Sequence, residues 1–253
     1  MAKLFVTSDI HSYFDELIDA LDKAGFDKDN PDHWLIVCGD CFDRGPNPIQ
    51  TMKYLRMLER YIIIKGNHES LLLECCERKY FCQHDISNGT WHTICEFGDA
   101  DKGYDFGECC TRTIARVGHF IDNMVDYFET KNYVFVHGFI PVSCDDNKPV
   151  YYQKKRKFSK MEDWRNANAE QWEQARWLNG MKMVDDGIST EKCIVVGHYH
   201  TSWGRANFDG KPEFGDDADF SPYYYEDKLI AIDACTAYSG KVNVLVLEDE
   251  FLE

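Results

Sequence analysis

The chain has 253 residues and a formal net charge of −16, with 44% hydrophobic and 28% charged residues. This length and composition are typical of one large globular α/β domain with a sizeable core. The negative charge argues against nucleic acid and anionic membranes as partners, because phosphate backbones are bound by clustered Lys and Arg. No apolar run is long enough to span a membrane and the start lacks a signal peptide, so we expect a cytoplasmic protein.

The first eighty residues predict three similar units, each a short strand followed by a polar turn and a helix. The expected strands are residues 3–8, 34–38 and 61–64, and apolar residues recur at helical spacing after the first two. Strands that alternate with helices at this length favour βαβ units and a largely parallel sheet. No linker marks a second domain, so residues 1–253 are expected to form a single domain.

Each of these strands ends in a turn that carries polar side chains. Asp9 and His11 follow the first strand, Asp40 follows the second and Asn67 follows the third. Open α/β sheets bind ligands outside the carboxyl ends of their strands, and adjacent parallel strands lie about 4.8 Å apart. If the three strands are neighbours, these side chains converge on one small volume.

The region from about 74 to 117 interrupts this rhythm with cysteines, aromatic residues and turn signals between helical fragments. An insertion of this size is typical of a segment that covers a functional site, and we expect a cap over the mouth of the site. The eleven cysteines are odd in number and the chain has no export signal. Reduced thiols are therefore favoured over disulfides, with a structural zinc site as the weaker alternative.

Further strands are expected later in the chain. Residues 133–136 and 193–196 are short apolar runs, and each ends in a Gly–His or His–Gly pair. Residues 228–234 and 241–247 are two apolar runs separated by a Ser–Gly turn. This pattern predicts an antiparallel hairpin near the C-terminal end.

Five of the nine histidines lie in the expected strand-end loops, beside carboxylates and an amide. A single histidine is more often a hydrogen-bonded structural residue, but five at successive strand ends are hard to explain by packing. Nitrogen and carboxylate ligands with an amide suit Mn²⁺, Fe or Zn²⁺ better than Ca²⁺. Two such ions about 3.5–4 Å apart can clamp a phosphoryl group and activate a water molecule. The five histidines are His11, His68, His137, His198 and His200.

Five motifs occur in the order and rough spacing of the calcineurin-like metallophosphoesterases. They are Asp9-x-His11, Gly39-Asp40-x-x-Asp43-Arg44-Gly45, Gly66-Asn67-His68-Glu69, His137-Gly138 and Gly197-His198. The second and third resemble the PPP branch, which contains serine/threonine protein phosphatases, bacterial and phage enzymes among them, and diadenosine tetraphosphatases. The resemblance implies a metallophosphatase α/β sandwich, in which two mixed β-sheets are flanked by helices and a cap region is inserted.

The resemblance also implies a site with two divalent metal ions, for which Mn²⁺ is favoured and Fe or Zn²⁺ are alternatives. One carboxylate would bridge the two ions, and the nucleophile would be a metal-bound hydroxide, so no serine or cysteine nucleophile is expected. The implied ligands are Asp9 and His11 for the first ion, Asp40 for both, and Asn67, His137 and His198 for the second.

Three residues would act on the substrate. The resemblance implies that His68 protonates the leaving alkoxide, that Asp43 orients its imidazole and that Arg44 clamps the phosphate through its fork of donors. Structural alternatives exist for several residues. Asp43 and Arg44 could form a surface ion pair, Asn67 could cap a helix and His137 could be a core histidine.

The predicted roles of four further residues depend on less specific matches to family motifs. His200 resembles the second histidine of the Gly-His-x-His motif in the wider superfamily and is expected to bind the first ion. The alternative is a side chain that contacts a ligand without binding the ion, or one that faces outward. Arg176, beside Trp177, resembles a second phosphate-binding arginine, with a surface helix position as the alternative. Asn88 and Trp91 in the cap region are candidate substrate contacts.

The expected activity is metal-dependent hydrolysis of a phosphoester. The favoured substrate is phosphoserine or phosphothreonine in proteins, with small phosphoesters also turned over. The alternative is a dinucleoside polyphosphate hydrolase of the diadenosine tetraphosphatase kind, which uses the same core. A catalytically silent homologue that only binds a partner is a third hypothesis, but such proteins usually lose ligands, and every expected ligand is present here.

Overall fold

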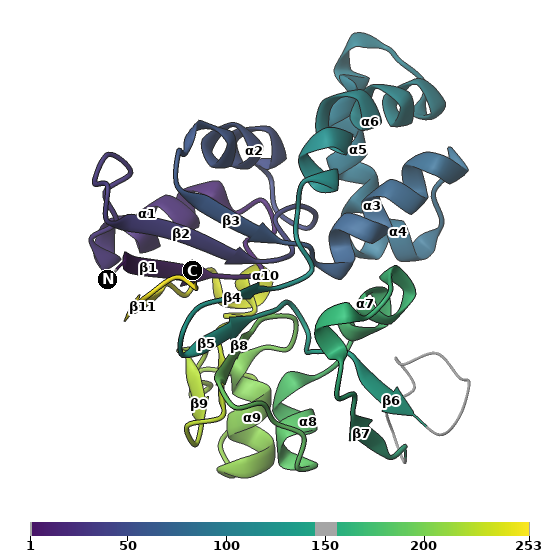
Figure 1. Cartoon of the computed structure of the whole chain (residues 1–253). Coiled ribbons are helices and arrows are strands. Elements are labelled where there is room, and N and C mark those ends of the chain that lie inside the picture. Colours follow the sequence, from purple (N-terminus) through teal and green to yellow (C-terminus); the bar gives the residue numbers. More distant parts are fainter. Residues whose placement is uncertain (1, 145–155, 253) are drawn as a thin grey trace.

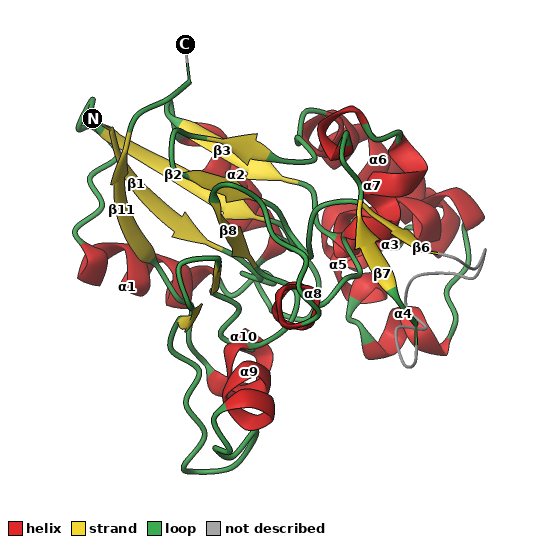
Figure 2. Cartoon of the chain, turned by 60° about the horizontal axis from the view of Figure 1, so that its bottom comes forward, coloured by secondary structure: helices red, strands yellow, loops and turns green. Residues whose placement is uncertain are grey.

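The computed structural model describes residues 2–144 and 156–252. Two mixed β-sheets pack against each other, and helices cover their outer faces (Figure 1). This arrangement confirms the expected α/β sandwich. A lobe made of helices lies to one side of the sheets, and Figure 2 shows helices and sheets by colour.

The first sheet has the strand order β11-β1-β2-β3. Its three parallel strands confirm the three predicted βα units, because β1 pairs with β2 and β2 pairs with β3. The turns that follow these strands therefore emerge at one edge of the sheet. The elements of this half are β1 (Ala2–Thr7), α1 (Phe14–Ala24), β2 (His33–Cys38), α2 (Pro48–Met57), β3 (Tyr61–Ile64) and β11 (Leu245–Asp249).

The second sheet has the order β4-β5-β8-β10-β9, with β5, β8 and β10 parallel. Its strands are β4 (Phe128–Glu129), β5 (Tyr133–Phe135), β8 (Cys193–Val196), β9 (Tyr223–Tyr225) and β10 (Leu229–Ala231). The other elements of this half are β6 (Val142–Cys144), β7 (Phe158–Lys160), α7 (Ala169–Ala175), α8 (Gly180–Asp185), α9 (Thr201–Phe208) and α10 (Thr236–Ser239).

The predicted C-terminal hairpin is wrong. Strand β10 belongs to the second sheet, whereas β11 pairs with β1 at the edge of the first. The segment between them crosses from one sheet to the other, and Ile232 and Leu245 are both buried in the core between the sheets. Burial of this crossing segment, rather than a local turn, decides its path.

Alternation of side chains along the strands builds three cores. In β1, Leu4 and Val6 point into the layer between the sheets, while Phe5 packs against the helices on the outer face. In β8, Val195 faces the layer between the sheets and Ile194 packs with the helices of the second half. Both faces of each sheet are thus covered, as expected for parallel strands that read as continuous apolar runs.

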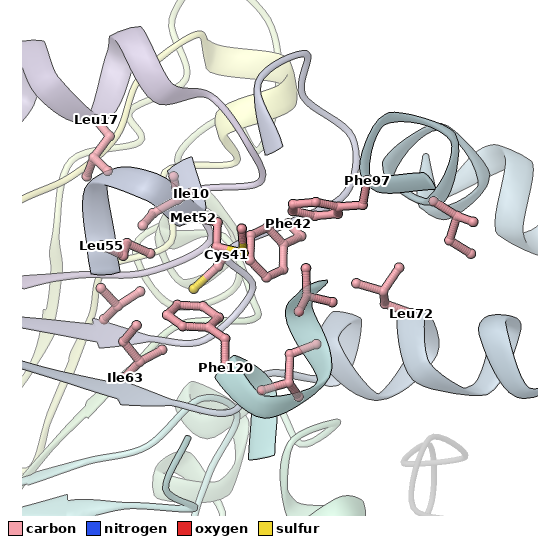
Figure 3. Packing of buried hydrophobic residues seen from close by; sticks show 14 of the residues in the cluster. Ile10, Leu17, Cys41, Phe42, Met52, Leu55, Ile63, Leu72, Phe97 and Phe120 are labelled. Carbon is pink, nitrogen blue, oxygen red and sulfur yellow. The ribbon is translucent and has the colours of Figure 1, made fainter. Parts of the chain in front are cut away.

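The helical lobe holds most of the segment between β3 and β4. It contains α3 (Asn67–Arg78), α4 (Gln83–Ser87), α5 (Thr90–Gly98) and α6 (Phe106–Asp122), so it extends beyond the predicted limits of 74 and 117. The ring of Phe42 lies 5.4 Å from Phe97 and 6.0 Å from Phe120 (Figure 3). These contacts anchor the loop after β2 to the lobe.

Among the helices of residues 2–144 and 156–252, none has the length and apolar character that a membrane span requires.

Candidate metal centre and active site

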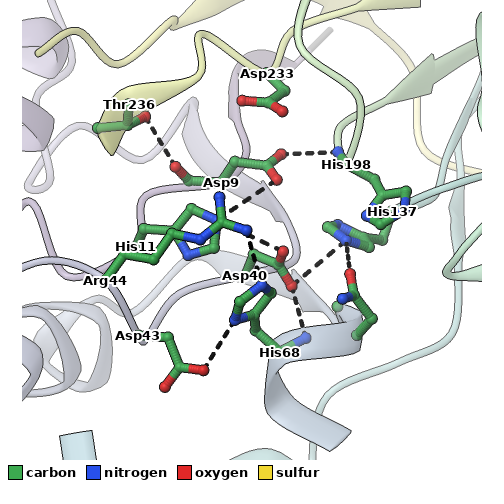
Figure 4. Close-up of polar contacts among 12 residues, drawn as sticks. Asp9, His11, Asp40, Asp43, Arg44, His68, His137, His198, Asp233 and Thr236 are labelled. Carbon is green, nitrogen blue, oxygen red and sulfur yellow. Dashed lines mark hydrogen bonds and ion pairs between the residues drawn. The ribbon is translucent and has the colours of Figure 1, made fainter. Parts of the chain in front are cut away.

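The loops that follow β1, β2, β3, β5 and β8 converge on one polar cluster (Figure 4). Six of its side chains are no more than 3% exposed, although all of them are polar. Buried polar groups persist only when hydrogen bonds or ions compensate for the lost water. The six residues are Asp9, His11, Asp40, Asn67, His68 and His137.

The backbone of this cluster is unusual. Residues other than glycine seldom adopt positive φ angles, and each such residue costs on the order of 1 kcal/mol. Of the eleven found in the described chain, seven lie in the converging loops and an eighth lies in the loop after β10. They are Asp9, His11, Ser12, Asp40, Asp43, Arg44, His198 and Cys235. This concentration of backbone strain is the pattern found where a fold holds side chains in place for a function.

Asp40 lies at the centre of the cluster, and its two oxygens face different partners. Oδ2 lies 3.7 Å from Nε2 of His11, while Oδ1 lies 3.4 Å from Nε2 of His137. Two groups of side chains could each hold an ion, one of His11, Asp40 and His68 and one of Asp40, His137 and His198. Asp40 is common to both groups, as the bridging carboxylate of a dimetal site must be.

Two histidines are oriented as metal ligands require. Nδ1 of His11 donates to the carbonyl of Phe42 at 2.9 Å, and Nδ1 of His137 donates to the carbonyl of Cys38 at 2.7 Å. A hydrogen bond on one ring nitrogen fixes the ring and leaves the other nitrogen to bind metal. In both residues the remaining Nε2 points toward Asp40. The donor set therefore fits divalent transition metals such as Mn²⁺, Fe and Zn²⁺.

Asp9 and Asn67 complete the set. Oδ1 of Asp9 lies 4.0 Å from Nε2 of His11, and its Oδ2 accepts the backbone N–H of His198 at 3.0 Å. Nε2 of His137 donates to Oδ1 of Asn67 at 2.9 Å. Asn67 is the first residue of α3, whose N-cap is Gly66. Its side chain therefore points to the cluster and does not cap the helix.

The electrostatics of the cluster suit a cation. Burial raises the pKa of Asp9 to about 6 and lowers the pKa of His198 to about 3, which keeps that imidazole neutral, as a metal ligand must be. Burial by itself would lower the pKa of His137, but Asp40 and Asp9 outweigh it and raise the pKa to about 10. Protonated His137 thus supplies a positive charge that a bound cation could supply instead.

His68 is held in one orientation from both sides. Its Nδ1 donates to Oδ2 of Asp43 at 2.8 Å, and the Thr90 hydroxyl donates to the same oxygen at 2.6 Å. Arg44 Nη2 lies 3.2 Å from His68 Nε2. Burial alone would lower the pKa of His68, but Asp40 and Asp43 outweigh burial and raise it. This pairing of an imidazole with an orienting carboxylate is typical of general acid–base catalysis.

A cavity of about 110 Å³ opens onto these groups. Its rim is formed by Arg44, Leu71, His84, Asn88 and Trp177. Sites that enclose a whole small-molecule ligand usually measure about 300–1,000 Å³. This cavity is therefore large enough for one end of a substrate and too small to enclose a whole one. Asn88, predicted as a substrate contact, lines the cavity.

His200 lies outside both groups of potential ligands. Its Nδ1 is bonded to the Ser202 hydroxyl at 2.8 Å, its Nε2 lies 3.5 Å from Glu213, and its ring packs 5.0 Å from Phe214. His200 is the N-cap residue of α9, and this position turns its side chain toward the loop that carries Glu213. His200 is therefore not among the side chains that the structure brings together, and its role as a ligand of the first ion stays a prediction.

Arg176 and Trp91 are also placed away from the cavity. The Arg176 guanidinium is bound by two carboxylates, Glu173 in α7 and Asp126 at 2.5 Å, and neither it nor Trp91 lines the cavity. Trp91 instead packs 6.3 Å from Phe81 on the lobe surface and is 38% exposed. These contacts hold both side chains outside the cavity lining, and their roles as substrate contacts stay predictions.

Three functional candidates were missed by the sequence reasoning. Asp233, buried at the end of β10, lies beside Asp9 (Figure 4), and burial raises its pKa well above the usual value. Its position directly after an apolar run was the signal that could have identified it. Thr90 follows the Asn–Gly pair of the cap region and supports Asp43. Glu69 stood within a quoted motif but received no role.

Glu69 connects the loops after β2 and β3. Its buried carboxylate accepts the N–H groups of Asp40 at 3.0 Å, Cys41 at 2.8 Å and Gly66 at 2.9 Å. Glu69→Gln replaces one acceptor oxygen with a donor, which leaves a buried N–H unpaired. We expect a loss of about 2 kcal/mol in the free energy of unfolding, measured in urea. Glu108→Gln, at an exposed helix N-terminus, serves as the control and should cost under about 1 kcal/mol.

Gly66 allows the same loops to approach closely. A Cβ at this position would lie 2.1 Å from Oδ1 and 2.4 Å from the backbone nitrogen of Asp40. We expect Gly66→Ala to displace Asp40, lower stability by about 1–3 kcal/mol and weaken metal binding, as measured by thermal unfolding with and without Mn²⁺. Gly118→Ala in α6, where the nearest atom is 3.5 Å away, should instead be neutral or stabilising. Equal effects at both sites would contradict this reading.

The fold and the bridged donor groups are those of a metallophosphatase-type α/β protein. The sequence profile of the calcineurin-like phosphoesterases matches residues 2–232. The chain therefore belongs to the calcineurin-like phosphoesterase family, whose members are phosphoester hydrolases.

Curated relatives match a shorter part of the chain. A symmetrical bis(5'-nucleosyl)-tetraphosphatase of Hamiltonella defensa is 37% identical over 70 residues, which cover 27% of this chain and 25% of that protein. The enzyme of the same name from Aeromonas salmonicida is 40% identical over 74 residues, 29% of this chain and 26% of that protein. The matched region thus spans about a quarter of the relatives' length.

Solved structures share the fold over nearly the whole chain. A candidate diadenosine tetraphosphatase is similar over 97% of this chain and 93% of its own, with a TM-score of 0.51 and 12% identity. The cold-active protein-tyrosine phosphatase of a psychrophilic Shewanella is similar over 98% of this chain and 76% of its own, with a TM-score of 0.53 and 14% identity. Identities this low establish the fold alone.

Proposed function

We propose that this chain is a dimetal-dependent phosphoester hydrolase. The observation that carries the proposal is the position of Asp40, whose two oxygens face two separate groups of metal-binding side chains. Two divalent ions, with Mn²⁺ favoured, would polarise the phosphoryl group, neutralise its charge and activate a water molecule as nucleophile. The ligands would be Asp9, His11, Asp40, Asn67, His137 and His198.

Three side chains would act on the substrate directly or through a neighbour. Arg44 would hold the phosphoryl oxygens, since its guanidinium is exposed at the cavity and can form paired hydrogen bonds. His68 would transfer a proton from Nε2 to the leaving oxygen, while Asp43 holds Nδ1. Arg44 contacts Nε2 in this structure, so engagement of Arg44 by the phosphoryl group would free Nε2 to carry that proton.

The helical lobe would serve as a cap on a single catalytic domain. His84 and Asn88, from α4 and the turn after it, form part of the cavity rim. The N–H of Arg44 donates to the carbonyl of Asn88 at 3.2 Å. The cap therefore positions the phosphate-binding arginine as well as the rim of the cavity.

The favoured substrate is a phosphomonoester such as phosphoserine or phosphothreonine in a protein. Arg44 is the one arginine or lysine among the described residues that line the cavity, which suits a single phosphoryl group. The net charge of −16 disfavours a substrate that carries several phosphates.

The second candidate is a dinucleoside tetraphosphate. The names of the curated relatives favour it, and the Trp177 ring at the cavity rim offers an aromatic surface for a base. Both substrates would be hydrolysed by the same residues of the metal centre. They differ in the group that would lie across the cavity rim, a protein segment or a nucleoside.

A substrate panel tests the proposal. The purified chain is stripped with a chelator, reloaded with Mn²⁺, Fe²⁺ or Zn²⁺, and assayed on p-nitrophenyl phosphate, a phosphoserine peptide and diadenosine tetraphosphate. We expect activity that depends on added metal and a higher kcat/KM for the phosphopeptide than for the tetraphosphate. The reverse order would select the second candidate. If no substrate were turned over with any of these metals, the chain would be a catalytically silent homologue that only binds a partner.

A further inference from the structure

Strand β3 forms an edge of the first sheet that is covered at its C-terminal end and open around Tyr61. It is the last strand in the order β11-β1-β2-β3, and Figure 2 shows it as the outermost one. Its four residues are Tyr-Ile-Ile-Ile, which favour strands strongly and include no charge or proline. Proteins usually block such edges with charges, proline or a covering segment, because open edges recruit other strands. An open edge of this kind is a candidate binding surface.

Val125 already pairs with the C-terminal part of this edge. The carbonyl of Ile63 accepts the N–H of Val125 at 3.0 Å, and the N–H of Lys65 donates to Val125 at 2.9 Å. Since backbone groups alternate along a strand, Tyr61 directs its N–H and carbonyl to the same outer side. Val125 is joined to the strand by an isolated bridge at Ile64, and it leaves the edge around Tyr61 open.

A groove of about 600 Å³ runs beside this edge, between β3, the end of α2 and the face of α6. Its floor is apolar and includes Ile62, Phe120 and Met124. Arg56 from α2 and Arg116 from α6 line its sides. Arg116 is already paired with Asp99, so Arg56 is the arginine that would meet an acidic partner. No aspartate or glutamate lines the groove among the described residues, although acidic residues outnumber basic ones 44 to 28 in the chain.

We propose that this groove docks an extended acidic segment of a partner protein, which adds to the edge of β3 as a further strand. Backbone hydrogen bonds to Tyr61 and to the N–H of Ile63 would supply affinity, as in other cases of strand addition. Alternate side chains would point either to the apolar floor or to Arg56, so a segment of alternating apolar and acidic residues matches best. This surface is separate from the cavity at the metal centre, and the proposal stands independently of the reaction.

A second copy of the chain fits the groove less well. Pairing of two β3 edges about a two-fold axis would bring Arg56 of each copy toward Arg56 of the other. Like charges placed in this way repel. An acidic segment instead gains from the same residues.

The test uses the full chain and a fluorescein-labelled peptide in which glutamate and valine alternate. Comparison peptides carry lysine in place of glutamate, or proline at the centre of the glutamate peptide. Fluorescence anisotropy should show saturable binding of the glutamate peptide alone. Arg56→Glu should weaken it at least about tenfold, which corresponds to ~1.4 kcal/mol. Arg60→Glu, a neighbouring residue outside the groove lining, is the charge-matched control and should change binding much less.

The edge itself is tested at Tyr61. Tyr61→Pro removes an outward N–H without breaking a bond to β2, so the chain should fold and lose binding, whereas Tyr61→Phe should bind as the wild type does. Equal binding of the lysine peptide, or unchanged binding by both Arg56→Glu and Tyr61→Pro, would overturn the proposal. Self-association in sedimentation experiments that Tyr61→Pro abolishes would also overturn it, in favour of a second copy as the occupant.

Discussion

Asp40→Asn is expected to remove both bound metal and turnover. The substitution deletes the charge of the one carboxylate that faces both donor groups, so neither ion keeps its shared anionic ligand. Loss of metal stabilisation of the transition state is worth several kcal/mol, so kcat/KM should fall by about a thousandfold or more. Metal content is measured by mass spectrometry of the purified protein, and turnover with p-nitrophenyl phosphate in Mn²⁺.

Asp249→Asn is the matched control for this experiment. Asp249 is equally buried, but its oxygens accept hydrogen bonds from Asn132 at the far end of the first sheet. The control should lose stability and keep its metal. If Asp40→Asn retained two ions per chain, the bridging role of this residue would be refuted.

His68→Asn is expected to keep the metals and lose turnover. His68 lies beside Asp40, but its Nδ1 is held by Asp43, as for a general acid. Removal of a general acid typically costs about 10²- to 10⁴-fold in rate. The loss should be larger for a phosphoserine peptide than for p-nitrophenyl phosphate, because the nitrophenolate leaves readily without a proton.

Two comparisons distinguish a general-acid role of His68 from a role as a metal ligand. His119→Asn, on an exposed turn of α6, should leave both metal and turnover unchanged. His68 also belongs to the donor group of His11 and Asp40. A drop in metal content in His68→Asn, with equal losses for both substrates, would instead assign His68 as a ligand.

Much of the fold was predictable because it rests on local patterns. Continuous apolar runs of strand length, each followed by a polar turn, predicted β1, β2 and β3, and the structure confirms that they are parallel neighbours. The C-terminal hairpin failed because a Ser–Gly turn between two apolar runs is equally compatible with a crossing between sheets. Burial of Ile232 and Leu245 between the sheets, a non-local effect, decided that case.

The candidate site was likewise predictable only where local sequence patterns decide the positions of its residues. Asp9, Asp40 and Asn67 could be grouped from sequence, because parallel strands bring their ends to one edge. His200, Arg176 and Trp91 could not be placed, because each side chain is directed by a partner distant in sequence or by the surface of the lobe.

The sequence by itself determined which chemical groups stand at the strand ends, since the order of strands and polar turns is written locally in the chain. Only the tertiary structure decided which oxygen of Asp40 faces which histidine and that Asp233 joins the cluster. The fold alone, likewise, left the edge of β3 open around Tyr61, beside a groove that Arg56 lines. These features depend on how two sheets and a helical lobe pack together, and packing is set by contacts between residues far apart in the chain.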